Sequence, residues 1–392
     1  VHALAMAVSA LVAIGCTRTS ATTPRDAAPL PMLSPRVADT VFYISARARE
    51  SSSDVYRFAD SLEFGYVIHS RRRQADVLTD GLDIALDDSV RLSRQEFTEQ
   101  LRLAALPSDA GTVDSGGNAD SIAVLYVHGY STSLHECWRN VTESRMRSRS
   151  ATPWVAFCWP SNGLGIAAPR RGALLDRAYR DDSTAAVASA PAFVRSAEIV
   201  LDAVAAPRLL FVAHSMGTQL MGAALSDSTT LSARLRATPA KAIVFAAADM
   251  ETTRFTDLIV PAVRPLTSRL VAYVSGRDRM LALSRQRSGE SCVGLRQRTP
   301  LVHPQLESID ATDALVAENW FQDIFGTHHA VRRASSVLFD LIFVVGGSRT
   351  PACRATLGTA LQSAEGVWQL LAVRPDIVAA AQRCARIPAS SP

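Results

Sequence analysis

Lysine is almost absent from this chain of 392 residues, because arginine supplies nearly all of its 41 basic residues and Lys241 is the one lysine. Aromatic residues make up only 6% of the chain. The basic residues are scattered among 37 acidic ones, which leaves a net charge of +4. The one dense cluster, Arg71–Arg73, is short and lacks interleaved aromatic residues. The composition therefore argues against a nucleic-acid partner and predicts an ordinary solvated surface.

Cysteine is also scarce, at six residues, and no spacing among them suggests a zinc site. We therefore expect no metal and no cofactor. Cys158 lies in an apolar run and is predicted to be a buried core thiol. Cys353 and Cys384 flank a stretch predicted to be helical and could form a disulfide, with Cys292 as a competing partner.

The apolar stretch 3–15 is too short for a comfortable membrane span, and it ends directly before Cys16. Residues 1–16 resemble a bacterial lipoprotein signal, in which Cys16 would become the lipidated first residue and anchor the protein to a membrane. The alternative is an ordinary secretory signal. Both interpretations predict that the mature protein leaves the cytoplasm for a compartment where disulfides can form, and the lipoprotein signal predicts the cell envelope. Residues 17–36 are rich in Thr, Ala and Pro, which predicts a flexible linker.

Apolar patterns predict one folded domain over residues 37–386. Its opening strands are expected to be antiparallel, and from residue 122 onward strand and helix patterns alternate. This alternation predicts an α/β fold with a mainly parallel central sheet and helices on both faces. The expected strands are 41–46, 62–69, 90–94, 122–127, 154–158, 209–213, 242–247 and 270–274, and the expected helices include 97–106, 133–148, 190–204 and 218–225.

Three further segments complete the domain. Residues 160–188 mix Gly, Arg and Asp and do not have a sheet pattern, so they are either a lid over the active-site edge or a surface loop. Residues 334–345 are apolar at helical spacing and too short to span a membrane, which predicts a core helix. Residues 357–386 are predicted to form one or two closing helices.

The sequence around Ser215 predicts a nucleophile. Ala213-His214-Ser215-Met216-Gly217 follows an apolar strand and precedes a helix start. A sharp turn between strand and helix would expose the serine hydroxyl above the edge of the sheet, and the small residues at positions 213 and 217 leave room for that turn. His214 is expected to pack beneath it.

A serine hydroxyl needs a histidine to take its proton and an acid to orient that histidine. Asp278 follows the strand 270–274 through a short turn and is the favoured acid, and Asp249, which also follows a strand, is the alternative. His328 and His329 lie in a later loop, and either could be the base. The chain order of serine, acid and histidine is the one expected for this constellation.

The oxyanion of an acyl-transfer intermediate needs two amide donors. Met216, directly after the predicted nucleophile, would supply one. The loop after strand 122–127 would supply the other through the amide of Tyr130, and Gly129 would let the chain turn without a side chain blocking the pocket.

Four motifs carry a family resemblance. They are His-Gly-Tyr-Ser-Thr-Ser at 128–133, Trp-Pro-Ser at 159–161, His-Ser-Met-Gly at 214–217, and the run 274–284 that contains Asp278. Together they resemble the bacterial α/β-hydrolase family called domain of unknown function 900, over residues 41–345. The resemblance implies an α/β-hydrolase fold and a serine hydrolase. Counting back from the Val-Leu-Phe-Asp segment at 337–340 favours His328, while the inserted Thr327 keeps His329 open.

We therefore expect an exported serine hydrolase that cleaves a small-molecule ester or lipid through an acyl-enzyme. A thioesterase or acyltransferase would use the same groups. A non-catalytic envelope-binding protein on a hydrolase fold is the competing class.

Overall fold

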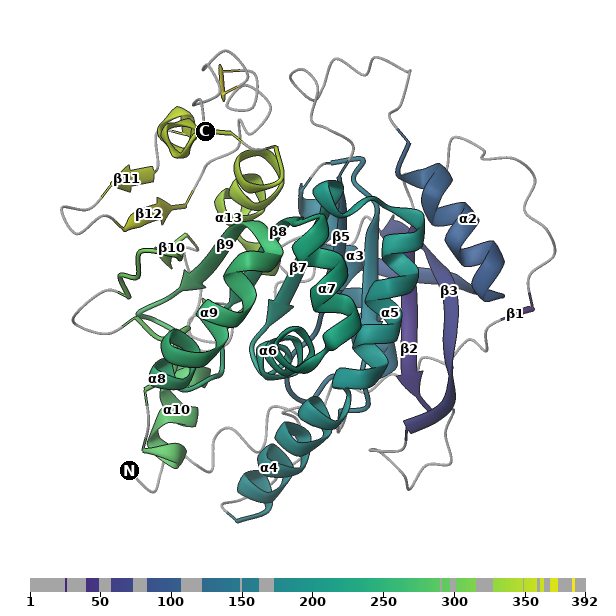
Figure 1. The fold of residues 1–392 in the computed structure, drawn as a ribbon, viewed down its shortest axis with the longest axis horizontal. Coiled ribbons are helices and arrows are strands. Elements are labelled where there is room, and N and C mark those ends of the chain that lie inside the picture. Colours follow the sequence, from purple (N-terminus) through teal and green to yellow (C-terminus); the bar gives the residue numbers. More distant parts are fainter. Residues whose placement is uncertain are drawn as a thin grey trace.

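A twelve-stranded sheet forms the centre of the computed structural model (Figure 1). The structure describes residues 25–26, 40–48, 58–72, 83–106, 122–148, 150–161, 173–289, 291–296, 301–314, 327–347, 349–357, 360–362, 367–372 and 383–384. Cys16, most of the predicted linker and residues 162–172 of the predicted lid lie outside these residues.

The strand order is β1-β4-β3-β2-β6-β5-β7-β8-β9-β10-β12-β11. In this order, every neighbouring pair from β2–β6 to β10–β12 is parallel, and so is β1–β4. The pairs β2–β3, β3–β4 and β11–β12 are antiparallel. The mainly parallel sheet with antiparallel N-terminal strands is confirmed. The strands are β1 (Arg25–Asp26), β2 (Thr40–Arg47), β3 (Phe58–Arg72), β4 (Asp83–Leu92), β5 (Ala123–Val127), β6 (Trp154–Cys158), β7 (Leu209–His214), β8 (Ala240–Ala246), β9 (Thr267–Val274), β10 (Glu307–Asp313), β11 (Ala360–Gln362) and β12 (Trp368–Leu371).

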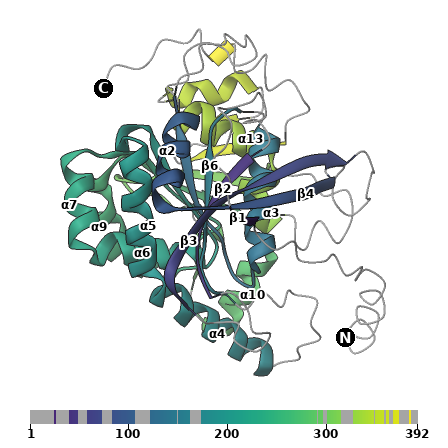
Figure 2. The ribbon, with the colours of Figure 1, turned by 90° about the vertical axis from the view of Figure 1, so that its right-hand side faces the viewer.

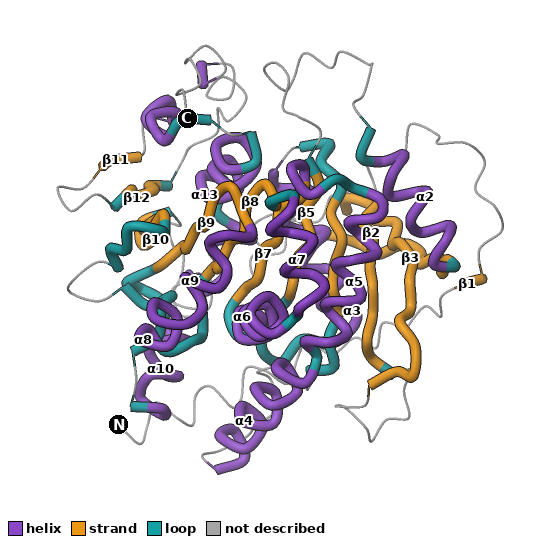
Figure 3. Tube along the Cα trace, viewed as in Figure 1, coloured by secondary structure: helices purple, strands orange, loops and turns teal. Residues whose placement is uncertain are grey.

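Helices cover both faces of the sheet, as Figures 2 and 3 show. The α-helices are α2 (Arg94–Ala104), α3 (Leu134–Ser148), α4 (Ala173–Ala188), α5 (Ala190–Ala203), α6 (Gly217–Asp227), α7 (Thr229–Ala237), α8 (Thr252–Arg254), α9 (Val260–Val263), α10 (Arg279–Ser288), α12 (Ala330–Arg333) and α13 (Ser335–Phe339). Phe255–Ile259 and Asp340–Val345 are π-helical. Short 3₁₀ segments include Thr327–His329 and Pro351–Leu357.

Alternate strand residues divide the interior into two cores. In β7, Leu209, Phe211 and Ala213 pack with α5, α6 and α7, whereas Leu210 and Val212 pack with α3 and α13. This follows from the two-residue period of a strand. Because both faces are buried, the central strands are almost wholly apolar, which is why they could be recognised in the sequence.

Two disulfides tie elements together, and one corrects the prediction for Cys158. Cys158 at the end of β6 is bonded to Cys137 in α3, so it is not a free core thiol. The apolar run Trp154–Cys158 does not indicate this partner, because Cys137 lies 21 residues earlier in the chain. Constraining a loop of that length stabilises the fold by about 3 kcal/mol. Cys353 is joined to Cys384, and among the described cysteines Cys292, which is buried, forms no disulfide.

The end of the domain differs from the predicted closing helices. The described residues there include strands β11 and β12, and β12 extends the parallel sheet beside β10. Leu370 of β12 is fully buried against the core on the α3 face. Pairing with β10 therefore decides the structure where local apolar content favoured a helix.

Two other segments differ from the sequence-based expectation. Residues 173–188 of the predicted lid form helix α4, so a surface loop is wrong for that part. Arg25 and Asp26, within the predicted linker, pair with Val90 and Arg91 of β4. Among the described residues no single helix is long and apolar enough to cross a membrane, although the bent pair 177–188 and 190–203 meets that criterion by length and composition.

Candidate active site

Ser215 occupies a strained turn between β7 and α6. Its φ angle is 53°, a left-handed conformation that costs a residue with a side chain about 1–3 kcal/mol. The turn is held from the neighbouring strand, because the Ser215 amide donates to the Ala246 carbonyl over 2.9 Å. The Ser215 carbonyl accepts from Thr218 at 3.0 Å and from Asp249 at 3.4 Å. The strand, turn and helix around Ser215 are thus arranged as the sequence predicts.

Two glycines let this turn pack against the loop that follows β5. A Cβ on Gly129 would lie 2.8 Å from the Cβ of Ser215. A Cβ on Gly217 would lie 2.3 Å from the His128 carbonyl oxygen. Neither position can hold a larger residue without movement of the backbone, so the loop after β5 lies directly against Ser215.

His328 connects Ser215 to Asp278. Its Nε2 lies 3.0 Å from the Ser215 Oγ, and its Nδ1 lies 2.7 Å from Oδ2 of Asp278. An ionised carboxylate can only accept, so Nδ1 carries a proton and the neutral ring offers Nε2 as an acceptor for the serine hydroxyl. The structure thus brings together the three residues favoured from the sequence.

The two carboxylate oxygens of Asp278 have different partners. Its Oδ1 accepts from the Leu281 amide at 2.9 Å and so caps α10, while Oδ2 binds His328. The capping bond fixes the carboxylate in place, because an N-cap aspartate is held at the first turn of its helix. The side chain is fully buried.

The surroundings of His328 favour its protonated form. Burial lowers the pKa of His328, but the carboxylates of Asp278, in direct contact, and Asp249, through space, outweigh burial. The pKa is therefore raised above the ordinary value of 6.5, even though Arg332 opposes the shift. An imidazolium formed at this position is stabilised by the nearby negative charge.

The other two histidines of this region have different surroundings. His214 Nε2 donates to the His328 carbonyl oxygen over 2.7 Å, which links the backbone of His328 to the residue directly before Ser215. Nδ1 of His329 is buried without a hydrogen-bond partner among the described residues. Burial, followed by the charge of Arg332, holds the pKa of His329 well below its usual range. His328, and not His329, is the residue that bonds to Ser215 and Asp278.

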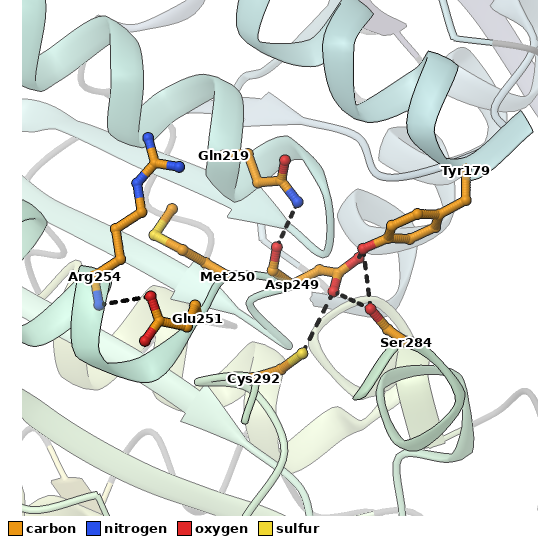
Figure 4. Close-up of a pocket in the computed structure, with 8 residues that line it drawn as sticks. All are labelled: Tyr179, Gln219, Asp249, Met250, Glu251, Arg254, Ser284 and Cys292. Carbon is orange, nitrogen blue, oxygen red and sulfur yellow. Dashed lines mark hydrogen bonds between the residues drawn. The ribbon is translucent and has the colours of Figure 1, made fainter. Parts of the chain in front are cut away.

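Asp249, the alternative acid, belongs to a separate network. Its carboxylate accepts from the hydroxyl of Tyr179 at 2.7 Å, the hydroxyl of Ser284 at 2.8 Å and the thiol of Cys292 at 3.6 Å (Figure 4). Its carbonyl accepts from Gln219 Nε2 at 2.7 Å. These side chains line a cavity of about 230 Å³, together with Met250, Glu251 and Arg254.

The loop after β5 contains Tyr130 and is fastened on several sides. The carbonyl of Gly129 accepts from Nδ1 of His128 at 2.9 Å and from the Thr132 hydroxyl at 3.2 Å. Burial lowers the pKa of His128 to about 3, so the ring is neutral. It stacks on Trp159 at 4.9 Å between ring centroids. The loop is therefore rigidly placed beside Ser215.

Comparison with known families adds to this geometry. The model of the family described as "Alpha/beta hydrolase of unknown function", domain of unknown function 900, matches residues 115–312. The chain belongs to this family. The match includes Ser215 and Asp278 and ends before His328, so it is the structure that places this histidine beside them. No curated protein matches the chain.

Several residues around the candidate site were not assigned to it from the sequence. Tyr179, Ser284 and Cys292 reach Asp249 from positions 70, 35 and 43 residues away. Such contacts have no local pattern, and the helix that carries Tyr179 lies in the segment that was interpreted as a lid or loop. Among the described residues there is no group of three or more His, Cys, Asp or Glu side chains able to hold a metal.

Proposed function

We propose that this α/β-hydrolase is a serine hydrolase that cleaves carboxylic esters through an acyl-enzyme intermediate. The observation that carries the proposal is the position of His328 between the Ser215 hydroxyl and the Asp278 carboxylate. A base bonded to the nucleophile on one side and to a buried acid on the other is the arrangement that activates serine.

The proposed reaction has two halves. Ser215 Oγ attacks the ester carbonyl carbon while its proton passes to Nε2 of His328, and the tetrahedral intermediate then expels the alcohol, which takes that proton. Water attacks the acyl-enzyme with His328 again as base, and the acid is released with Ser215 restored. Asp278 would stabilise the imidazolium in both halves. The amides of Met216 and Tyr130 would bind the oxyanion, which the close approach of Gly129 to Ser215 supports.

A fluorophosphonate probe, which phosphonylates an activated serine, tests the proposal directly. We expect labelling of the mature protein, with labelling lost in Ser215→Ala and in His328→Ala. His329→Ala and Ser284→Ala are the controls, because His329 is the adjacent histidine and Ser284 is a buried serine that bonds to Asp249, and we expect both variants to label. Hydrolysis of p-nitrophenyl esters should fall by at least about 10⁴-fold in Ser215→Ala.

The same experiment separates the other functions. A folded wild-type protein that does not label would contradict the hydrolase proposal and favour a binding role. Labelling together with turnover of acyl thioesters, or transfer of the acyl group to an added alcohol in place of water, would instead favour a thioesterase or acyltransferase.

We propose further that the protein is exported and anchored to the envelope through Cys16. Two disulfides among the described cysteines support an oxidising compartment. Mass spectrometry of the mature N-terminus would find a diacylated cysteine at position 16, and Cys16→Ser would release the protein from the membrane fraction. An unmodified N-terminus produced by cleavage elsewhere would favour an ordinary secretory signal.

A further inference from the structure

Helix α4 contacts the loop after β5 through a buried acid. Oδ2 of Asp182 accepts a hydrogen bond from the Ser131 amide over 2.8 Å, and Asp182 is fully buried. Ser131 has a φ of 52°, one of three residues other than glycine with positive φ among those described. A conformation that residues with side chains rarely adopt persists only where the surroundings hold it, and the Asp182 carboxylate provides such a hold.

This contact bears on the orientation of the Tyr130 amide. Tyr130 lies between two peptide groups, and the structure fixes both. The preceding one is held through its carbonyl, on Gly129, by His128 and Thr132. The following one is held through its N–H, on Ser131, by Asp182. In a trans peptide the N–H points opposite to the carbonyl, so the bonds to the Gly129 carbonyl set the direction of the Tyr130 N–H. The Asp182 bond fixes the next peptide group, and so limits rotation of the backbone about the Tyr130 Cα that would turn the two peptide groups relative to each other.

Helix α4 is itself held firmly against the site. The Tyr179 ring packs against the Tyr130 ring with centroids 5.8 Å apart, and the Tyr179 hydroxyl bonds to Asp249. Figure 4 shows Tyr179 reaching from its helix toward Asp249. One turn further along, the Ser183 hydroxyl donates to the side chain of Gln219 in α6 at 2.7 Å. A carboxylate carried on a helix with these attachments has a defined position.

We propose that Asp182 is a positioning residue of the oxyanion hole, which holds the Tyr130–Ser131 segment so that the Tyr130 amide faces the oxyanion formed at Ser215. The inference rests on the proposed function and adds to it a residue from the segment 160–188. Asp182 does not touch the reacting atoms and acts through the loop. Its effect is therefore expected on transition-state binding rather than on substrate binding.

The test compares three variants of the full chain. In Asp182→Ala the Ser131 amide loses its acceptor, whereas in Asp182→Asn the side-chain carbonyl can still accept. Asp181→Ala is the matched control, because Asp181 is the exposed neighbour on the same helix. The measurements are kcat and KM with p-nitrophenyl butyrate, and the inhibition constant of phenylboronic acid, whose adduct with serine places an oxygen in the oxyanion hole.

We expect Asp182→Ala to lower kcat by about 10- to 100-fold, with KM changed less than about twofold. The phenylboronic acid inhibition constant should rise by a similar factor. Asp182→Asn should recover most of the activity, and Asp181→Ala should match the wild type. A role in folding alone would lower the melting temperature without this parallel loss of boronate affinity.

Two results would overturn the inference while leaving the proposed function intact. One is a folded Asp182→Ala variant with wild-type kcat. The other is a loss of kcat with unchanged boronate affinity. A wild-type protein that neither labels with fluorophosphonate nor hydrolyses esters would instead refute the proposed function, and the inference with it.

Discussion

Two buried aspartates follow neighbouring parallel strands, and their partners differ. Asp278, after β9, bonds to His328. Asp249, after β8, accepts from two hydroxyls and a thiol. Both positions satisfy the same rule, that an acid beyond the carboxyl end of a strand faces the active-site edge. The comparison teaches that the partner decides what such an acid does, since only an imidazole among these partners can carry a proton to and from the serine.

The two acids also differ in how they act on their surroundings. Asp278 stabilises a charge on His328 through a direct hydrogen bond. Asp249 keeps its own partners neutral: burial, followed by the charge of Asp249, raises the pKa values of Tyr179 and Cys292. It also raises the pKa of His328 without contacting it. In the proposed reaction the first aspartate would therefore act on the catalytic histidine, whereas the second contributes to structure and to local electrostatics.

The largest expected difference between the two sites is in turnover. Asp278→Asn should lower kcat by about 10³- to 10⁴-fold, because an amide cannot hold the same tautomer of His328 or stabilise its charge. Asp249→Asn should lower kcat by less than about tenfold, since the Asp249 carboxylate bonds to Tyr179, Ser284 and Cys292 and the substitution keeps the backbone amide that donates to Ser215. Steady-state hydrolysis of p-nitrophenyl butyrate measures both variants.

Asparagine is a suitable replacement at both positions because it keeps the side-chain shape. At position 278 it can still accept from the Leu281 amide and cap α10, so loss of activity would not reflect an unfolded helix. Equal losses in the two variants would show that the distinction between the sites is wrong, and a larger loss in Asp249→Asn would make Asp249 the acid of the reaction.

The sequence predicted much of this arrangement because its signals are local. Ser215 lies between an apolar strand and a helix, and Asp278 follows an apolar strand. The Asp182–Ser131 bond and the Cys137–Cys158 disulfide depend on chain segments that meet only in the fold. Strand β10 was missed for a different reason: Glu307–Asp313 contains three acids, and pairing on both sides makes it a strand despite poor β-propensity.

The second prediction concerns stability. Tyr179→Phe keeps the ring but removes the hydroxyl that donates to Asp249, which leaves a buried carboxylate oxygen without this donor. Such a loss costs about 1–3 kcal/mol of unfolding free energy. Urea denaturation would measure it, with Ser284→Ala as the matched removal of the donor to the other oxygen. An unchanged unfolding free energy in both variants would mean that the network contributes nothing to stability.

The third prediction concerns pH. His328 must be unprotonated to act as a base, and its pKa is raised, so kcat/KM should fall on the acid side with a midpoint above 6.5. Asp249→Asn removes one of the two carboxylates that raise this pKa, so the midpoint should move toward lower pH. Opposing charge comes from Arg332, which is unchanged in this variant.

Asp257→Asn is the control for this pH profile. Asp257 is an exposed acid of the π-helix Phe255–Ile259, and the charges that change the pKa of His328 are those of Asp278, Asp249 and Arg332. Its profile should coincide with that of the wild type. A midpoint in Asp249→Asn equal to the wild-type midpoint would mean that Asp249 does not act on His328 through space.

The smallest expected effect is on the reactivity of Cys292. Burial and then Asp249 raise the pKa of this thiol to about 12, so only about one molecule in 10⁴ carries the reactive thiolate at pH 8. Asp249→Asn removes the negative charge and should speed alkylation by iodoacetamide, on the order of tenfold for each unit by which the pKa falls. Asp278 also raises this pKa, but less than Asp249 does, so Asp278→Asn should speed alkylation less. Mass spectrometry of the peptide that contains Cys292 would follow the rate. Faster alkylation in Asp278→Asn than in Asp249→Asn would mean that Asp278 has the larger effect on the pKa of the Cys292 thiol. That result would contradict the division between the two sites.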